Sequence, residues 1–122
     1  MSARISFDLL VLDAADIGAE ARFYADLLGW SVTDQSADWI TVRGESGAGL
    51  AFQLAPDHRP PSWPDESIPQ QAHLDLTVDD LDAAEARALE LGARRTGLPD
   101  KPDSSFRVYL DPAGHPFCLC AC

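Results

Sequence analysis

The sequence has few basic residues, few cysteines and no long apolar run, and each shortage excludes a class of protein. Only 9 Lys and Arg stand against 20 Asp and Glu, which gives a net charge of −11. Nucleic-acid binding and attachment to an anionic membrane both need clustered basic side chains, so neither is expected. No apolar run reaches the ~20 residues that cross a membrane, and the N-terminus has no signal-peptide core. We therefore expect a cytoplasmic protein.

The three cysteines crowd at the C-terminus as Cys118, Cys120 and Cys122. Their odd number and close spacing do not make a disulfide framework. If residues 116–121 form a strand, the three side chains share one face, because strand side chains alternate. They are then either small buried apolar side chains beside a frayed terminus, or thiolate ligands that bind a metal together with His73. As a nucleophile, Cys118 has no second basic residue placed by the sequence to activate it.

What the sequence does contain is an internal repeat. Asp16-Ile17 recurs 64 positions later as Asp80-Leu81, and Glu20-Ala21-Arg22 recurs as Glu85-Ala86-Arg87. A strand-like apolar run precedes Asp16 in the first copy and Asp80 in the second, and a glycine follows each helix-like stretch. Two copies of about 60 residues do not suit a stacked array of short repeats. The repeat instead favours two mixed strand–helix modules around a shared cavity.

Periodicity predicts the elements of the first copy. Residues 4–12 are rich in Ile, Leu and Val and alternate loosely, which is typical of a buried strand. Asp16 is a good cap for a helix that ends at Leu28, where Gly29 supplies the left-handed stop. Three further strands are expected at residues 30–33, 39–43 and 50–54.

The second copy repeats this order. We expect a strand over residues 72–78 and a helix that begins at Asp79 or Asp80 and stops at Gly92. Between the copies, residues 56–71 hold five of the nine prolines and are expected to form a semi-rigid linker with His58 exposed to solvent. The remaining strands are expected at residues 94–95, 105–110 and 116–121.

Three motifs give the chain a family resemblance. They are Phe23-Tyr24-Ala25-Asp26-Leu27-Leu28-Gly29-Trp30, His73-Leu74-Asp75-Leu76 followed by Val78-Asp79-Asp80-Leu81-Asp82, and Asp111-Pro112-Ala113-Gly114-His115-Pro116-Phe117. With these motifs the chain resembles the vicinal oxygen chelate (VOC) superfamily, the group of glyoxalases, bleomycin-resistance proteins and extradiol dioxygenases. The resemblance covers residues 4–121 and is closest to short bacterial glyoxalase-like proteins.

The resemblance implies an α+β fold in one domain, residues 1–122. Its two βαβββ modules, residues 4–55 and 72–121, would curl into a half-barrel with the helices outside. It also implies a homodimer. The superfamily contains isomerases, lyases, dioxygenases and metal-free drug-binding proteins, so the fold by itself does not give the reaction.

In the metal-using members, four ligands come from the first and last strand of each module. The repeat places Leu9, Gln53, His73 and Cys118 at the matching positions. Leu9 cannot bind a metal, Gln53 is a weak oxygen ligand, and Cys118 is soft where a hard carboxylate is expected. We therefore expect no family-type metal and no cofactor. If a divalent ion (zinc, nickel, iron or manganese) does bind, the candidate ligands are Gln53, His73 and Cys118.

Two functions from different classes remain open. The first is metal-free binding of a small hydrophobic or aromatic molecule in the sheet cavity. The second is a lyase, isomerase or dioxygenase-like reaction on a carbonyl or vicinal-oxygen substrate, with His73 as the catalytic group. Asp75 shares the face of His73 and is placed to orient its imidazole or a ligand. The predicted ligand-binding residues are Leu9, Gln53, His73, Asp75, Cys118, Trp39, Phe52 and Trp63, with Phe106 and Phe117 as further aromatic candidates.

A purely structural alternative stands beside each of these assignments. His73 would then only hydrogen-bond Gln53, and Asp75 would lie on a solvated rim. Trp63 would cap the edge of the core instead of closing over a ligand. His115 is expected to be a turn residue without chemistry.

Overall fold

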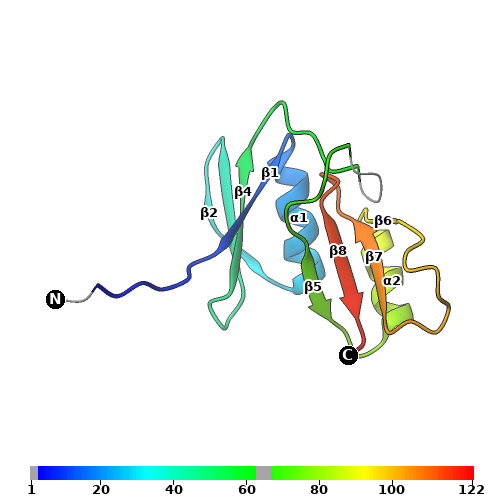
Figure 1. The fold of residues 1–122 in the computed structure, drawn as a ribbon. Coiled ribbons are helices and arrows are strands. Elements are labelled where there is room, and N and C mark those ends of the chain that lie inside the picture. The colour runs from blue at the N-terminus through cyan, green and yellow to red at the C-terminus, as the bar shows by residue number, and fades with distance from the viewer. Residues whose placement is uncertain (1–2, 63–66) are drawn as a thin grey trace. The chain divides into compact units, whose positions relative to one another are not determined.

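The structure is a computed structural model that describes residues 3–62 and 67–122. The chain divides into two units, Met1–Pro56 and Asp57–Cys122. Each unit has one helix and one four-stranded mixed sheet (Figure 1).

Unit 1 follows the order predicted for the first copy. In its sheet, β1 runs parallel to β4, and β3 pairs antiparallel with both β4 and β2. The sheet order is therefore β1-β4-β3-β2, with β1 and β2 at the edges. The elements are β1 (Leu10–Ala14), α1 (Ile17–Leu28), β2 (Ser31–Gln35), β3 (Trp39–Arg43) and β4 (Gly49–Leu54).

Helix α1 begins and ends as the sequence predicts, and it packs against one face of this sheet. The Asp16 carboxylate accepts a hydrogen bond from the Ala19 amide at 3.0 Å, and Gly29 takes the left-handed conformation with φ 69°. The ring of Phe52 on β4 stacks on Tyr24 of α1, with centroids 5.8 Å apart. Both rings are fully buried, so this stack forms the centre of the unit 1 core.

The strand predicted over residues 4–12 is wrong for residues 4–9, because β1 begins only at Leu10. Its partner β4 begins at Gly49, and the first paired residues are Leu10 and Leu50. Before Gly49 the chain turns back toward β3, so residues 3–9 have no neighbouring strand to pair with inside unit 1. A strand needs such a neighbour to satisfy its backbone groups.

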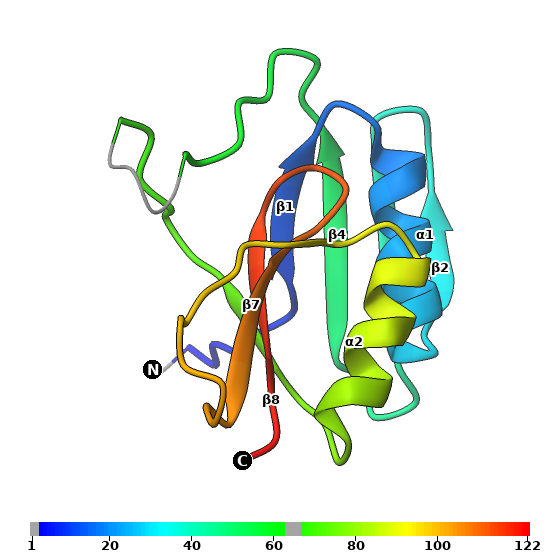
Figure 2. The same ribbon diagram turned by 90° about the vertical axis from the view of Figure 1, so that its right-hand side faces the viewer.

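Unit 2 repeats the order with a different pattern of packing. Its sheet order is β5-β8-β7-β6, with β5 parallel to β8 and the other pairs antiparallel. Figure 2 shows α2 alongside this sheet and the long connection that leads from α2 back to β7. The elements are β5 (Leu74–Thr77), α2 (Leu81–Glu90), β6 (Arg94–Arg95), β7 (Phe106–Leu110) and β8 (Pro116–Cys120).

Helix α2 is capped by Asp80, whose carboxylate accepts from the Ala83 amide at 3.0 Å. Ala88 is the buried residue of this helix. The helix also makes polar contacts with the sheet: the Tyr109 hydroxyl donates to Glu85 at 2.9 Å, and Arg107 lies 3.3 Å from the same carboxylate. Burial and the hydrogen bond to Glu85 raise the pKa of Tyr109 to about 12. The Tyr109 ring stacks on Phe117, with centroids 5.4 Å apart. Both rings of this core pair come from strands, whereas in unit 1 one ring of the pair comes from the helix.

The start of the linker packs onto unit 2, so the prediction of an exposed His58 is wrong. His58 is half-buried, its ring lies 4.8 Å from that of His115, and its Nε2 is 3.2 Å from the Ala113 carbonyl oxygen. The turn beneath it is held by Asp111, whose carboxylate accepts from the amides of Ala113 and His115. His115 is therefore a turn residue that also provides a surface for the linker.

These observations confirm an α+β fold built from two βαβββ modules. Across residues 3–62 and 67–122, no helix has the length and hydropathy needed to span a membrane.

Candidate ligand site in unit 2

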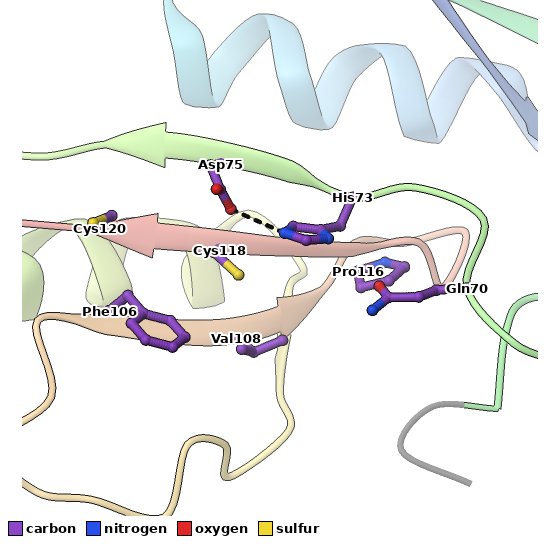
Figure 3. Close-up of a pocket in the computed structure, with 8 residues that line it drawn as sticks. All are labelled: Gln70, His73, Asp75, Phe106, Val108, Pro116, Cys118 and Cys120. Atoms are coloured by element: carbon purple, nitrogen blue, oxygen red, sulfur yellow. Dashed lines mark ion pairs between the residues drawn. The ribbon is translucent and has the colours of Figure 1, made fainter. Parts of the chain in front are cut away.

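The open face of the unit 2 sheet carries a pocket of about 390 Å³. It lies on the opposite side of the sheet from the Tyr109–Phe117 stack, because its β8 residues alternate with Phe117. Figure 3 shows side chains from β5, β7 and β8 converging on it. Most of its wall is apolar, and a polar group stands at one side. The lining residues are Gln70, His73, Asp75, Phe106, Val108, Pro116, Cys118 and Cys120.

The polar group is a histidine–carboxylate pair. His73 lies just before β5 and Asp75 lies within it, so the two side chains stand on the same face two residues apart. Nε2 of His73 is 3.1 Å from Oδ1 of Asp75, the contact dashed in Figure 3. Both side chains are open to solvent, at 41% and 70% exposure, so a ligand entering the pocket can reach them. The structure therefore brings Asp75 into contact with the imidazole of His73.

Cys118 faces this pair from the neighbouring strand. It is the residue opposite Asp75 in the β5–β8 register, and it is only 8% exposed. Burial, then the negative charge of Asp75 and a hydrogen bond with it, raise the pKa of the Cys118 thiol to about 11. At neutral pH the side chain is therefore a neutral thiol, which is a poor nucleophile.

The other two cysteines lie beside each other at the end of the chain. Cys120 and Cys122 are paired, with Cα atoms 5.3 Å apart, and Cys118 is the free cysteine among the described residues. Cys118 is the cysteine whose sulfur groups with His73 and Asp75.

The remaining predicted ligand-binding residues belong to unit 1, apart from Trp63, which lies outside the described residues. Leu9 is half-buried directly before β1. Trp39 and Gln53 face each other across β3 and β4, and the indole of Trp39 donates to the Thr41 hydroxyl at 2.8 Å. Phe52 lies in the core on the opposite face from Gln53, because neighbouring strand residues point to opposite sides. Gln53 and Phe52 therefore cannot line one cavity.

Phe117 follows the same rule. It lies against Tyr109 in the core, while its neighbour Cys118 faces the pocket. Phe106 does line the pocket, where it is 39% exposed. Sequence reasoning missed Gln70, Val108, Pro116 and Cys120 as lining residues. Alternation from Phe106 and Cys118 predicts the last three of these, since each lies two residues away on the same strand.

The strand registers also refine the comparison between the two modules. When the helix caps Asp16 and Asp80 are aligned, Val11 takes the place of Asp75. Val11 lies opposite Ala51, whereas Asp75 lies opposite Cys118. The register counterpart of Cys118 is therefore Ala51, two residues before the predicted Gln53.

Some members of the superfamily use a metal, and unit 2 offers a donor set that can be tested against one. One donor atom each from His73, Asp75 and Cys118 lie within 4.8 Å of one another. An imidazole, a carboxylate and a thiolate suit Zn²⁺, which accepts nitrogen, oxygen and sulfur ligands. They do not suit a hard cation such as Mn²⁺, which prefers oxygen ligands. The described residues of unit 2 thus fit zinc and do not fit a hard-cation site.

Comparison with known proteins agrees with this fold. The family model of the glyoxalase-like domain matches residues 9–120, nearly the whole chain. The chain belongs to the glyoxalase-like family. A search of curated proteins finds no match.

Solved structures with the same fold include enzymes and proteins of open function. A glyoxalase/bleomycin resistance protein/dioxygenase family enzyme from Burkholderia phytofirmans PsJN is 19% identical, with a TM-score of 0.68 and coverage of 92% of this chain and 94% of that one. A possible glyoxalase from Bacillus cereus is 16% identical, with a TM-score of 0.71 and coverage of 97% and 100%.

A third similar structure contains a metal. It is a mutant of the fosfomycin resistance protein FosX from Listeria monocytogenes in complex with Mn(II) and 1S,2S-dihydroxypropylphosphonic acid. It is 14% identical, with a TM-score of 0.69 and coverage of 98% of this chain and 91% of that one. At these identities the likeness concerns the fold.

Proposed function

We propose that this glyoxalase-like protein binds a small apolar or aromatic molecule in the pocket of unit 2, without a family-type metal. The observation that carries the proposal is the composition of the pocket. Its walls are apolar, with Phe106, Val108 and Pro116 among them, and the His73–Asp75 pair supplies one polar group at the side. Small-molecule sites typically combine apolar walls with a few polar groups that fix orientation.

The size and chemistry of the pocket define the ligand class. A volume of about 390 Å³ lies within the range of small-molecule pockets, roughly 300–1,000 Å³. Phe106 offers a ring face at the mouth, which favours an aromatic or planar ligand. The imidazole of His73, held by Asp75, can donate or accept one hydrogen bond. We therefore expect a planar, mostly apolar molecule with one hydroxyl or carbonyl group.

Cys118 contributes an apolar surface to the pocket when no metal is bound. Its pKa is raised to about 11, mainly by burial, so the thiol is neutral near pH 7. In the neutral state, Cys118 is a small apolar wall of the pocket.

Binding can be tested with two probes that differ by one polar group, 1-naphthol and naphthalene. We expect Phe106→Ala to weaken both by about tenfold, because the ring wall is lost. His73→Leu should weaken 1-naphthol by about fivefold and leave naphthalene unchanged, because only 1-naphthol can bond the imidazole. Trp39→Ala, the register counterpart of Phe106 in unit 1, is the matched control and should change neither affinity.

Two results would contradict the proposal. One is the absence of 1-naphthol binding together with no organic molecule in the native mass spectrum of freshly purified protein. The other is a loss of binding in Trp39→Ala while Phe106→Ala binds normally, which would place the ligand in unit 1.

A second function is favoured by the grouping of His73, Asp75 and Cys118 within 4.8 Å. Here these three residues would hold Zn²⁺, which would polarise a substrate oxygen when bound. His73 without a metal is also a candidate general base on a carbonyl substrate, since Asp75 fixes its orientation. Elemental analysis separates the hypotheses. Stoichiometric zinc that is lost in Cys118→Ala and kept in Cys120→Ala would replace the metal-free proposal with this one.

A further inference from the structure

Residues 3–9 form an extended arm in which apolar and polar side chains alternate, and residues 3–8 of it are exposed. Ile5 is 93% and Phe7 is 85% exposed, the highest values among the large exposed apolar residues of the described chain. Figure 1 shows the segment running away from β1 as an extended trace. Burying such side chains away from water is favourable. The arm therefore has a strong tendency to be covered by another surface.

The arm continues the edge strand of the unit 1 sheet. It leads directly into β1, which pairs with β4 within that sheet. Extended segments pair readily with one another through free N–H and C=O groups. The Asp8 carboxylate also binds Arg43 of β3 at 2.6 Å, which fixes the base of the arm to the sheet.

The sequence of the arm is complementary to itself when it is turned around. If two copies of Arg4-Ile5-Ser6-Phe7-Asp8 run antiparallel with Ser6 opposite Ser6, each Arg4 faces an Asp8 of the other copy. Ile5 then faces Phe7 on the opposite side of the ribbon, and Ala3 faces Leu9 beside them. One side of the ribbon is wholly apolar, and the other carries two ion pairs across the strands.

We infer that residues 3–9 pair antiparallel with the same segment of a second copy of this chain, about a two-fold axis at Ser6. Such an isologous interface is closed, since each contact occurs twice and no third chain can add. It gives the expected homodimer a specific surface. The interface lies in unit 1 and uses no residue of the unit 2 pocket, so either proposal can fail without the other.

The register can be tested by charge reversal and mixing. Arg4→Asp places two aspartates opposite each other twice in the dimer, and Asp8→Arg does the same with two arginines. Each variant alone should dimerise at least about tenfold more weakly than the wild type. An equimolar mixture should recover wild-type affinity as a heterodimer, because Asp at position 4 of one chain then faces Arg at position 8 of the other. Native mass spectrometry separates the three dimers by mass.

Two further variants test the apolar side and the anchor. Phe7→Ser should raise the dimer dissociation constant by about 30-fold, since two phenylalanines leave the interface. Val32→Ser, on the other edge of the same sheet, is the matched control and should leave it unchanged. Arg43→Gln removes the contact with Asp8 but keeps the arm charges, so the recovery in the mixture should persist in this background.

Three outcomes would overturn the inference. One is a wild-type chain that stays monomeric at all concentrations, which would indicate that the arm folds onto its own chain. Another is a dimer that both charge variants keep at full strength, which would place the interface elsewhere. The third is a mixture that dimerises no better than its components while circular dichroism shows both variants to be folded.

Discussion

The two units are built on one plan but present different chemistry on their open sheet faces. Unit 2 carries a histidine, a carboxylate and a thiol around its pocket. At the corresponding positions of unit 1, the side chains are all apolar. The pairs are Leu9 with His73, Val11 with Asp75, and Ala51 with Cys118.

The features that define the scaffold are the same in both units. Each helix begins at an aspartate that caps the third residue of the helix, and each sheet pairs its first strand parallel to its last. Each last strand places a phenylalanine in the core, Phe52 in β4 and Phe117 in β8, and each ring stacks on a tyrosine. Because these features stabilise the units, they constrain the sequence, whereas an open face can change residues at little cost in stability.

The units differ in how the helix meets the sheet. Helix α1 brings a buried Tyr24 into the unit 1 core, and its buried face also includes Ile17, Ala21 and Phe23. Helix α2 buries Ala88 and makes polar contacts with the sheet. Glu85 binds Tyr109, Arg95 and Arg107, and Asp82 accepts from Arg107 at 2.8 Å. A polar contact of this kind depends on geometry more than an apolar one.

The largest expected effect tests the shared core. Phe52→Ala and Phe117→Ala should each lower the free energy of unfolding by about 3–5 kcal/mol, because each leaves a cavity beside a stacked tyrosine. Urea denaturation followed by circular dichroism measures both. A loss below about 1 kcal/mol in only one variant would show that the two aromatic positions are not equivalent in packing.

The second prediction concerns the reactivity of Cys118, which lies on the pocket face of the unit 2 sheet. In a chain with Cys120→Ser and Cys122→Ser, the rate of iodoacetamide alkylation should rise with a midpoint near pH 11, since the thiolate is the reactive form. At pH 8, we expect it to be about 100-fold slower than an exposed cysteine.

Asp75→Asn removes the negative charge beside Cys118, a charge that has no counterpart at Val11 of unit 1. The midpoint of Cys118 alkylation should therefore move to lower pH. The raised pKa also has a consequence for stability. The contribution of the protonated thiol is complete below the ordinary cysteine value of 9.0 and is lost as the pH rises toward 11. A midpoint at the ordinary value, unaffected by Asp75→Asn, would contradict the contact between the two residues.

The third effect compares one glycine from each unit. Gly29 has φ 69°, and a Cβ added there would have no other atom within 4 Å, so Gly29→Ala should cost about 1 kcal/mol from backbone strain alone. Gly114 has φ 90°, and a Cβ there would lie 2.5 Å from Cβ of Pro60, so Gly114→Ala should cost about 2–3 kcal/mol. Thermal unfolding measures the difference. Equal costs would indicate that the linker does not pack on the 111–115 turn.

The smallest effect concerns the helix caps. Asp16→Ala and Asp80→Ala should each cost about 1 kcal/mol, because each frees one amide of the first helical turn. Asparagine keeps the accepting oxygen, so Asp16→Asn and Asp80→Asn should restore most of the loss in urea denaturation. If an alanine variant were as stable as the wild type, its cap would contribute nothing in that unit.

Local signals in the sequence were sufficient for most of the fold. Caps, left-handed glycines and alternation depend on a few neighbouring residues, and they placed both helices and seven of the eight strands within about two residues. The family resemblance assigned the order of the two modules. The strand over 4–12 failed because alternation describes the side chains of a segment and does not show whether another strand lies beside it.

The sequence by itself determined the two βαβββ modules, their caps and the pairing of His73 with Asp75 on one face, because these follow from local periodicity. Only the tertiary structure decided that Cys118 lies opposite Asp75, that Ala51 and not Gln53 is its counterpart, and that residues 3–9 lack a neighbour. Strand register depends on long-range pairing, and residues far apart in sequence meet only when the whole sheet has formed.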